Sequence, residues 1–542
     1  MTTTAPVYLA FQGGGARGVS HVGGLAAVEE LGLHIDGVAG TSAGALVAAL
    51  VAAGYSSRDI LDAQNRSHIL QRIADGKFKD PTQLFTANGW RAIVSLRIWT
   101  RRWSKVHSLW STCSEAWRPL LVSAAIAIPI VLGYFAPGPL LVAIALVAIA
   151  ARGIFVKIHS GLAPLTDIRE AVDQALASAL GIPAGNITFA QLQASGKRPL
   201  KLIATNVSDQ SLALFCYETT PDTPVADAVA ASICLPFIFK LWTFQSTVNG
   251  VTAMRSYLDG GLMSNLPIWP FDEERALNPH AITIAFGLRP SPRAGERSAH
   301  WLPAAVNTVV AGPPEIHFRG VEKLVHVPLE SVLDLLDFDA GFAAFSTNIQ
   351  LAKDMALQQL KHEITEVPVY MRALLDRMRE HIRDKPFGFL GIPAPGVCRV
   401  ALAIQRPTQK LSFSIAYETG HFAPPNSFHL ALASIPGSAW HRRFEEEPIM
   451  EIFQDESPSF GKVYPDSRWM ALVPIQAPAD EDGIDPALAV VAIIDSPEPI
   501  DSNAMQNARK LNDLAIEIRR FALDFSTQND LGTSARRAFS WL

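Results

Sequence analysis

Two glycine-rich turns within the first 54 residues constrain this chain more than any other feature. The first, QGGGARG, follows the apolar run VYLAF (7–11) and precedes a helix-like stretch at 19–31 with apolar residues at three-residue spacing. The second, GTSAG, follows LHIDGVAG and precedes AGALVAALVAAG, which runs to Gly54. Repeated strand, turn and helix units of this kind predict an α/β fold.

The second turn places Ser42 between Gly40 and Gly44. A serine on a strand-to-helix turn presents its hydroxyl on a strained tip, and small neighbours let a substrate approach it. The alternative is that Ser42 only caps the helix that follows, which is a common use of serine. A G-x-S-x-G pattern is expected by chance in roughly one chain in six of this length, so the pattern by itself does not decide between the two.

The first turn also allows two interpretations. Gly13, Gly15 and Gly18 fit G-x-G-x-x-G, and Asp36 lies at a suitable distance for a dinucleotide ribose contact. Alternatively, the loop N–H groups form an oxyanion hole for a tetrahedral acyl intermediate. The serine turn begins within six residues of Asp36 and leaves little room for a second Rossmann strand and helix, which favours the oxyanion hole.

A serine nucleophile needs a base downstream. His280 and His326 are candidates for a triad, but neither lies in a glycine-bounded turn. Asp259 in SYLDGGLMSNLPI is the better candidate, because it ends an apolar run and precedes Gly260 and Gly261. Its alternative interpretation is an ordinary turn aspartate.

These three blocks, in this order, closely resemble the bacterial patatin-like phospholipases. Further matches are ASICLPFIF, the Asn and Pro of SNLP after the triplet, and LDFDAGFAAFSTNIQLA at 336–352; Cys234 stands where a small residue such as alanine is expected. The resemblance covers about residues 5–90 and 155–365. It implies a serine–aspartate dyad with Ser42 as the nucleophile and Asp259 as the base, and it implies neither a metal nor a cofactor.

The resemblance also implies an oxyanion loop, made of Gly13, Gly14, Gly15, Ala16, Arg17 and Gly18. The aspartate of such a dyad needs burial to raise its pKa, because a carboxylate whose pKa is near 4 is a poor base for a hydroxyl. Arg17 either orients the loop or meets an anionic head group.

Composition limits the partners and the cellular compartment that we expect for this protein. The 46 basic and 51 acidic residues give no field that would attract nucleic acid. The four cysteines, at 113, 216, 234 and 398, have neither disulfide-like nor metal-like spacing, which favours a reducing compartment. The N-terminus has no basic stretch before an apolar run, so no secretory signal is expected and a cytoplasmic location follows.

Residues 119–151 form a run of uncharged, mainly apolar residues that PGP at 137–139 divides. One straight helix would span about 50 Å, well beyond a bilayer core of about 30 Å. A hairpin of two helices fits better and either crosses the bilayer or stays in one leaflet. Basic residues on both flanks favour both ends at the cytoplasmic side.

The approach to this run is rich in tryptophan. On a helix, Trp99, Trp103, Trp110 and Trp117 fall within about 40° of one another, with Arg101 and Lys105 opposite. This pattern is typical of a helix in the lipid interface, and a buried helical subdomain over the active site is the alternative. We expect contact with the bilayer through residues 99–151, at the cytoplasmic face of the inner membrane.

The sequence pattern changes in the last third of the chain. Five strand-like runs (VALAIQ, LSFSIAYE, FHLALASI, WMALVPIQA and LAVVAIID) precede a closing amphipathic helix, and their order looks like a GAF-type sensory domain. A small regulatory ligand, a homodimer interface and a purely structural role are all compatible with it.

The expected architecture is a patatin-like three-layer α/β/α core with an inserted apolar hairpin and a C-terminal α+β domain. The expected segments are 1–90 and 158–365 (core), 91–157 (insertion), 366–395 (linker helix and loop) and 396–542 (GAF-like domain). The expected function is a membrane-associated serine acyl-ester hydrolase of the phospholipase A or lysophospholipase type, which releases fatty acid. One alternative is a membrane-anchored sensor with the lipase core as scaffold; another is a nucleotide-dependent enzyme with GGGARG as a phosphate cradle.

Overall fold

A computed structural model shows two compact units, Met1–His317 with Val327–Leu357 and Phe318–His326 with Gln358–Leu542. The structure describes residues 6–62, 65–72, 80–95, 97–98, 123, 141–142, 146, 149, 152, 161–248, 250–278, 280–290, 318, 321, 323–406, 409–421, 425, 429–431, 434–442, 449–453, 462–476, 489–501 and 507–537.

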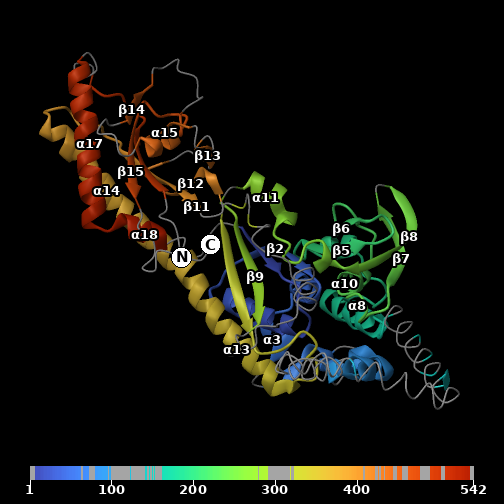
Figure 1. Cartoon of the computed structure of the whole chain (residues 1–542). Coiled ribbons are helices and arrows are strands. Elements are labelled where there is room, and N and C mark those ends of the chain that lie inside the picture. The colour runs from blue at the N-terminus through green and yellow to red at the C-terminus, as the bar shows by residue number, and fades with distance from the viewer. Residues whose placement is uncertain are drawn as a thin grey trace. The chain divides into compact units, whose positions relative to one another are not determined.

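The first unit is built on a mixed sheet with the strand order β10-β9-β1-β2-β5-β8-β7, and β6 pairs with β5 (Figure 1). Its centre is parallel: β1 pairs with β2 and β9, and β2 pairs with β5. The hairpin of β7 and β8 extends it antiparallel to β5. The strands are β1 (Val7–Phe11), β2 (Ile35–Thr41), β5 (Leu200–Asn206), β6 (Ser211–Phe215), β7 (Trp242–Val248), β8 (Val251–Asp259), β9 (Ile282–Pro290) and β10 (Leu324–Ser331).

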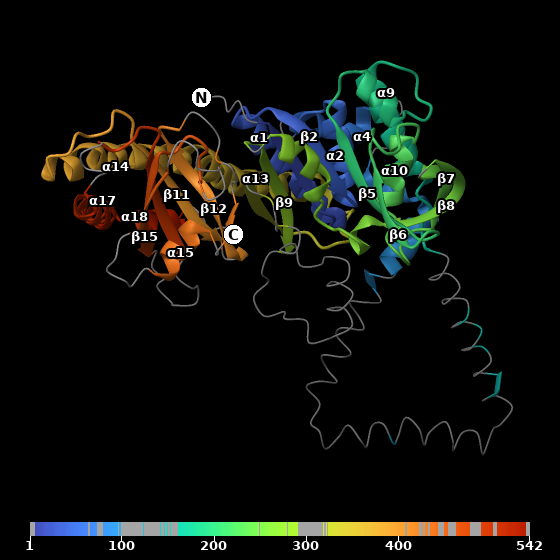
Figure 2. The ribbon, with the colours of Figure 1, turned by 90° about the horizontal axis from the view of Figure 1, so that it is seen from above.

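Helices cover both faces of the central strands. On one face, α1 (Ser20–Glu30) contacts β9, α2 (Ala43–Ala53) contacts β2, and α10 (Val225–Ser232) contacts β5 (Figure 2). On the other face, Phe271 stacks on Tyr8 beside the short elements η5 (Trp269–Phe271) and α11 (Asp272–Leu277). The expected α/β core with helices on both faces of the sheet is therefore confirmed.

Both faces of the central strands are buried, so β1 and β2 are apolar throughout apart from Asp36 and Thr41. In parallel strands the carboxyl ends meet at one edge of the sheet. The loop after β1 and the turn after β2 therefore lie together there, as the register pair Phe11 and Gly40 shows.

The second unit is a six-stranded antiparallel sheet with helices on both faces. The strand order is β13-β12-β11-β16-β15-β14. One face packs on α14 (Val367–Phe389) and α17 (Ala508–Gln528), and the other face packs on α15 (Ile435–His441). The strands are β11 (Arg399–Arg406), β12 (Gln409–Thr419), β13 (His429–Ala431), β14 (Ile449–Ile452), β15 (Trp469–Gln476) and β16 (Ala489–Ser496). The α+β architecture is as expected, and the likeness to a GAF domain stays a prediction.

Helix α14 shows how the second unit begins. Helix α13 (Gly341–Leu360) continues through a π-helical stretch, Lys361–Glu366, into α14. The sequence predicts a connecting helix here. In the structure, α14 buries Met371, Leu374 and Met378 completely in the core of the second unit, so it belongs to that unit.

The predicted tryptophan-rich helix (99–117) lies outside the described residues, and so does the apolar hairpin (119–151) apart from the single residues 123, 141–142, 146 and 149. Among the helices that the structure does describe, none combines the length and the apolar character that a membrane span needs. The hairpin therefore stays a prediction.

Candidate active site

Ser42 lies at the junction of β2 and α2, with φ 53° and ψ −125°. A residue with a side chain seldom adopts positive φ, so this turn is strained. The Ser42 side chain makes no capping hydrogen bond to α2, which argues against the helix-cap interpretation. A Cβ at Gly40 would stand 2.3 Å from the Gly44 oxygen, and one at Gly44 would stand 2.2 Å from the Phe11 oxygen. Both flanking glycines are thus required by close backbone approach.

Two side chains hold this turn. The buried Ser42 N–H donates to Ser232 Oγ at 2.9 Å, and the Ser232 hydroxyl donates in turn to the Ile203 carbonyl at 2.5 Å. Thr41 Oγ1 donates to the Ser264 carbonyl at 2.8 Å and so ties the serine turn to the segment after Asp259. Sequence reasoning missed Ser232, although it lies in the ASICLPFIF block; the one signal for it is a serine at the end of an alanine-rich helix.

Asp259 ends β8 and opens the short helix η4 (Gly260–Leu262). It is 1% exposed, its Oδ1 accepts the Gly261 N–H at 2.7 Å, and its own N–H donates to the Cys234 carbonyl at 2.8 Å. A Cβ at Gly260 would stand 2.2 Å from the Ile203 oxygen, so the glycine lets the turn lie against β5. The carboxyl is therefore fixed by backbone contacts on one side.

The Ser42 hydroxyl lies close enough to the Asp259 carboxyl to affect its ionisation. Burial raises the pKa of Asp259 to about 7, while the Ser42 hydroxyl and the Gly261 N–H act to lower it. Within the described part of the chain, however, Asp259 Oδ2 accepts no hydrogen bond. The fold thus brings Ser42 and Asp259 together from distant parts of the sequence, adjacent but not joined by a hydrogen bond, and the elevated pKa suits a base that works near neutral pH.

The glycine loop contacts the nucleophile directly, since a Cβ at Gly13 would stand 2.9 Å from Ser42 Cβ. Three of its N–H groups are already used: Gly13 donates to the Asn265 carbonyl at 3.0 Å, Ala16 to Leu335 at 2.9 Å and Arg17 to Gly14 at 3.2 Å.

Gly14 and Gly15 are the remaining candidates for oxyanion donors. Neither N–H donates to a backbone or side-chain acceptor among the described residues. The first N–H groups of α2, which have no acceptor within their own helix, begin beside the end of the same loop: a Cβ at Gly18 would stand 2.6 Å from Ala43 Cβ. The arrangement can hold a negatively charged oxygen beside Ser42.

The contacts of the Arg17 side chain do not fit a role in holding the oxyanion. Its Nε donates to the Leu333 carbonyl at 3.2 Å, and burial lowers the pKa of the guanidinium despite the nearby Asp334 and Asp337. Of the two interpretations in the sequence, these contacts favour an arginine that braces the loop.

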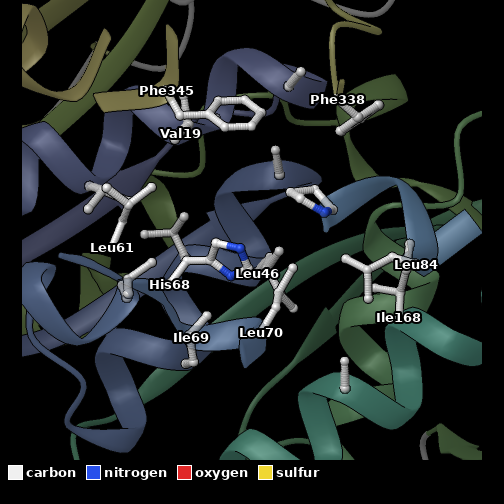
Figure 3. Close-up of a pocket in the computed structure, with 18 of the residues that line it drawn as sticks. Val19, Leu46, Leu61, His68, Ile69, Leu70, Leu84, Ile168, Phe338 and Phe345 are labelled. Carbon is white, nitrogen blue, oxygen red and sulfur yellow. The ribbon is translucent and has the colours of Figure 1, made fainter. Parts of the chain in front are cut away.

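A cavity of about 870 Å³ opens beside Ser42. Figure 3 shows its wall, in which aliphatic and aromatic side chains surround the His68 ring. They come from α2, from the segment 61–70, from α8 (Thr166–Leu180) and from the stretch before and inside α13; examples are Leu46, Leu61, Ile69, Leu70, Ile168, Phe338 and Phe345. A cavity of this size and polarity suits a long hydrocarbon chain.

The histidines singled out in the sequence lie elsewhere. His280 is exposed, with its N–H on Asn278 Oδ1, and it does not line the cavity. His326 lies in the edge strand β10, where it packs on Phe318. His21 is fully buried against the Gln12 carbonyl at 2.8 Å, and burial lowers its pKa to about 4, which fits a neutral structural role.

The geometry also argues against a dinucleotide site. Asp36 accepts the Val7 N–H at 2.9 Å, at the amino end of β1 and β2. The glycine loop lies at the opposite, carboxyl end of these parallel strands. Asp36 therefore cannot meet a ribose held by the loop.

Comparison with known proteins shows what this chain is similar to. A sequence model of the patatin-like phospholipase family matches residues 9–272. An uncharacterized protein of Bacillus subtilis, YqhO, is 26% identical over 333 residues, which are 60% of this chain and 87% of that protein. Lysophospholipase NTE1 of Eremothecium gossypii is 53% identical over 47 residues, 9% of this chain and 3% of that protein. Among solved structures, VipD from Legionella pneumophila aligns with a TM-score of 0.31 at 16% identity and covers 71% of this chain and 77% of its own.

The glycine loop, the serine turn and the Asp-Gly-Gly turn all fall within the matched residues. The chain therefore carries a patatin-like phospholipase domain over residues 9–272 and is a lipid acyl hydrolase.

Proposed function

We propose that this protein is a membrane-associated hydrolase of the phospholipase A or lysophospholipase type, in which Ser42 and Asp259 act as a catalytic dyad. The observation that carries the proposal is the buried Asp259 carboxyl, whose pKa is about 7 and is influenced by the Ser42 hydroxyl, and whose Oδ2 is unpartnered in the described part of the chain. The apolar cavity next to Ser42 supports a fatty acyl chain as the group that is transferred.

In the first step, the Ser42 hydroxyl gives its proton to Asp259 while its oxygen attacks the ester carbonyl. The Gly14 and Gly15 N–H groups stabilise the tetrahedral oxyanion, and one such donor is typically worth about 3–4 kcal/mol in the transition state. The intermediate collapses to an acyl ester of Ser42 as the alcohol leaves with the proton from Asp259. Water then attacks the acyl ester, with Asp259 again as the base, and releases the fatty acid.

Membrane association is proposed for residues 99–151. The described residues that flank this segment in the sequence lie at the cavity: Phe85, just before the helical residues 87–95, lines it, and Ala163 pairs with the cavity residue Phe239. A segment anchored there in the cytoplasmic face of the inner membrane would place the cavity near its lipid substrate. The regulatory ligand or homodimer predicted for residues 396–542 stays a prediction.

Labelling with a fluorophosphonate tests the dyad. Wild type is expected to be labelled, Ser42→Ala is not, and Asp259→Asn is expected to lose fatty acid release from lipid micelles. Labelling that persists in Ser42→Ala would remove Ser42 as nucleophile, and retained turnover in Asp259→Asn would place the base elsewhere. Products released from a mixed lipid extract, identified by mass spectrometry, would distinguish the phospholipase A type from the lysophospholipase type.

Deletion of Arg101–Lys157 tests the membrane proposal separately. We expect the deleted protein to move from the membrane pellet to the soluble fraction, and unchanged pelleting would contradict the proposal. Fluorophosphonate labelling of the deleted protein reports whether the active site survives the deletion.

A further inference from the structure

The glycine loop is held from outside by residues 331–340, which we call the acidic strap because they contain Asp334, Asp337 and Asp339. The Leu335 carbonyl accepts the Ala16 N–H at 2.9 Å. Gly15, at φ 55°, touches the same carbonyl so closely that a Cβ there would stand 2.3 Å from it. The contact is thus between two backbones, and a shift of the strap must move the loop.

One end of the strap is fixed by Asn348. Its Oδ1 accepts the Val332 N–H at 3.0 Å, and its Nδ2 donates to Ser20 Oγ at 2.5 Å. Asn348 is fully buried, so it joins the strap to α13 and to the start of α1. Inside the strap, the Asp334 N–H donates to Asp337 Oδ2 at 2.9 Å and closes a turn.

The other end is fixed by Arg97. Its two terminal nitrogens donate to the two carboxylate oxygens of Asp339 at 2.6 and 2.7 Å, and Nη1 also lies 3.3 Å from Asp337. This two-pronged geometry is the strongest and most directional form of an arginine–carboxylate pair. Asp339 is also the main cause that raises the pKa of the Arg97 guanidinium.

The strap is also a wall of the cavity. Phe338, between the two aspartates that Arg97 binds, lines the cavity (Figure 3), and its ring centroid lies 4.7 Å from that of Phe85. A displacement at Arg97 therefore affects the acyl cavity and the oxyanion donors through the same segment.

We infer that Arg97 is a positioning residue for acyl transfer: through Asp339 it fixes the acidic strap, and through the Leu335 carbonyl the strap fixes Gly14 and Gly15 relative to Ser42. This inference rests on the proposed function of the dyad. A misplacement of about 1 Å at a reacting centre can cost roughly 100-fold in rate, whereas a partly exposed ion pair contributes about 1 kcal/mol or less to stability. Loss of the pair should therefore reduce kcat far more than it reduces stability.

A double-mutant cycle on the full-length protein tests this. The variants are Arg97→Gln, Asp339→Asn and the double variant, with Arg91→Gln as the matched control because Arg91 is exposed on the helical stretch 87–95 just before Arg97. The substrate is a short-chain p-nitrophenyl ester below its micelle concentration, so that binding to a lipid surface does not enter.

Each single variant is expected to lose about tenfold or more in kcat with KM within about twofold, because the oxyanion donors act in the transition state. The double variant should be no slower than the slower single variant, since both remove the same contact. Arg91→Gln should match wild type, and thermal unfolding should keep the variants within a few degrees of it.

The inference is wrong if Arg97→Gln keeps kcat within twofold of wild type, if its loss appears in KM alone, or if the two single losses multiply in the double variant. Should Arg97→Gln fail to fold, Asp339→Asn decides by the same kcat criterion. Failure of the proposed function looks different: Ser42→Ala would then hydrolyse the ester as fast as wild type.

Discussion

At the scale of single residues, the dyad predicts a dependence of rate on pH. Burial raises the pKa of Asp259 from 3.8 to about 7, so the carboxylate that must accept the Ser42 proton is depleted below neutral pH. We expect kcat/KM to be level above pH 8 and to fall about tenfold per pH unit below pH 7. Initial rates on a soluble ester between pH 5 and 9 measure this, and a profile that is level down to pH 5 would contradict Asp259 as the base.

The same carboxyl predicts an effect on stability. Because the pKa of Asp259 is higher in the folded state than in the unfolded state, its contribution is fully present below about pH 4 and is lost as pH rises through 7. Asp259→Asn mimics the protonated form and should gain about 2–4 kcal/mol in free energy of unfolding at pH 8 but almost nothing at pH 4. Denaturant unfolding at the two pH values checks it; equal differences at both would show that the carboxyl is not strained by burial.

Ser232 predicts a positioning effect on the nucleophile. Ser232→Ala leaves the buried Ser42 N–H and the Ile203 carbonyl without their shared partner, at a cost of about 1–3 kcal/mol. Because Ser42 has positive φ, we also expect its fluorophosphonate labelling to slow by about tenfold. Ser195→Ala is the control, since the exposed Ser195 hydroxyl donates to the Gln191 carbonyl within its own helix; labelling equal in both variants would deny Ser232 this role.

At the scale of elements, the packing of α2 on β1 predicts a strict need for glycine. Gly44→Ala would place a Cβ 2.2 Å from the Phe11 oxygen, which is backbone and cannot move aside alone. We expect a loss of about 1–3 kcal/mol and of fluorophosphonate labelling. Gly388→Ala in α14 is the control: its Cβ would meet nothing within 4 Å, and the change should be neutral or stabilising by up to about 1 kcal/mol.

The elements themselves show what a sequence can and cannot predict. The α2 turn and the β1 loop were predictable because local patterns, apolar runs broken by glycine, determine them. The strand β14 was not, since its four residues are half-exposed and carry no clear alternation. The Ser232 hydrogen bond and the acidic strap depend on long-range contacts between residues separated by 190 and about 320 positions, for which a single sequence holds no signal.

At the scale of the whole molecule, each unit has a core of its own. Trp469 is fully buried in a cluster whose members all come from residues 367–535. This cluster includes side chains of α14 and α17. Phe286, by contrast, packs between Phe11 and Gly24 behind the glycine loop. The cavity and the dyad are built from residues of the first unit alone.

These separate cores predict that the two units unfold independently. Trp469→Ala should cost about 3–5 kcal/mol, lower the unfolding temperature of the second unit and make it sensitive to protease, while Ser42 is still labelled at the wild-type rate below that transition. Phe286→Ala, of similar cost, should abolish labelling first, because it loosens the strand that the Gln12 N–H binds at 3.1 Å beside the loop. Calorimetry with labelling at each temperature tests both. If labelling of Trp469→Ala disappears together with the unfolding transition of the second unit, the active site depends on that unit for its structure. The two units would then not unfold independently.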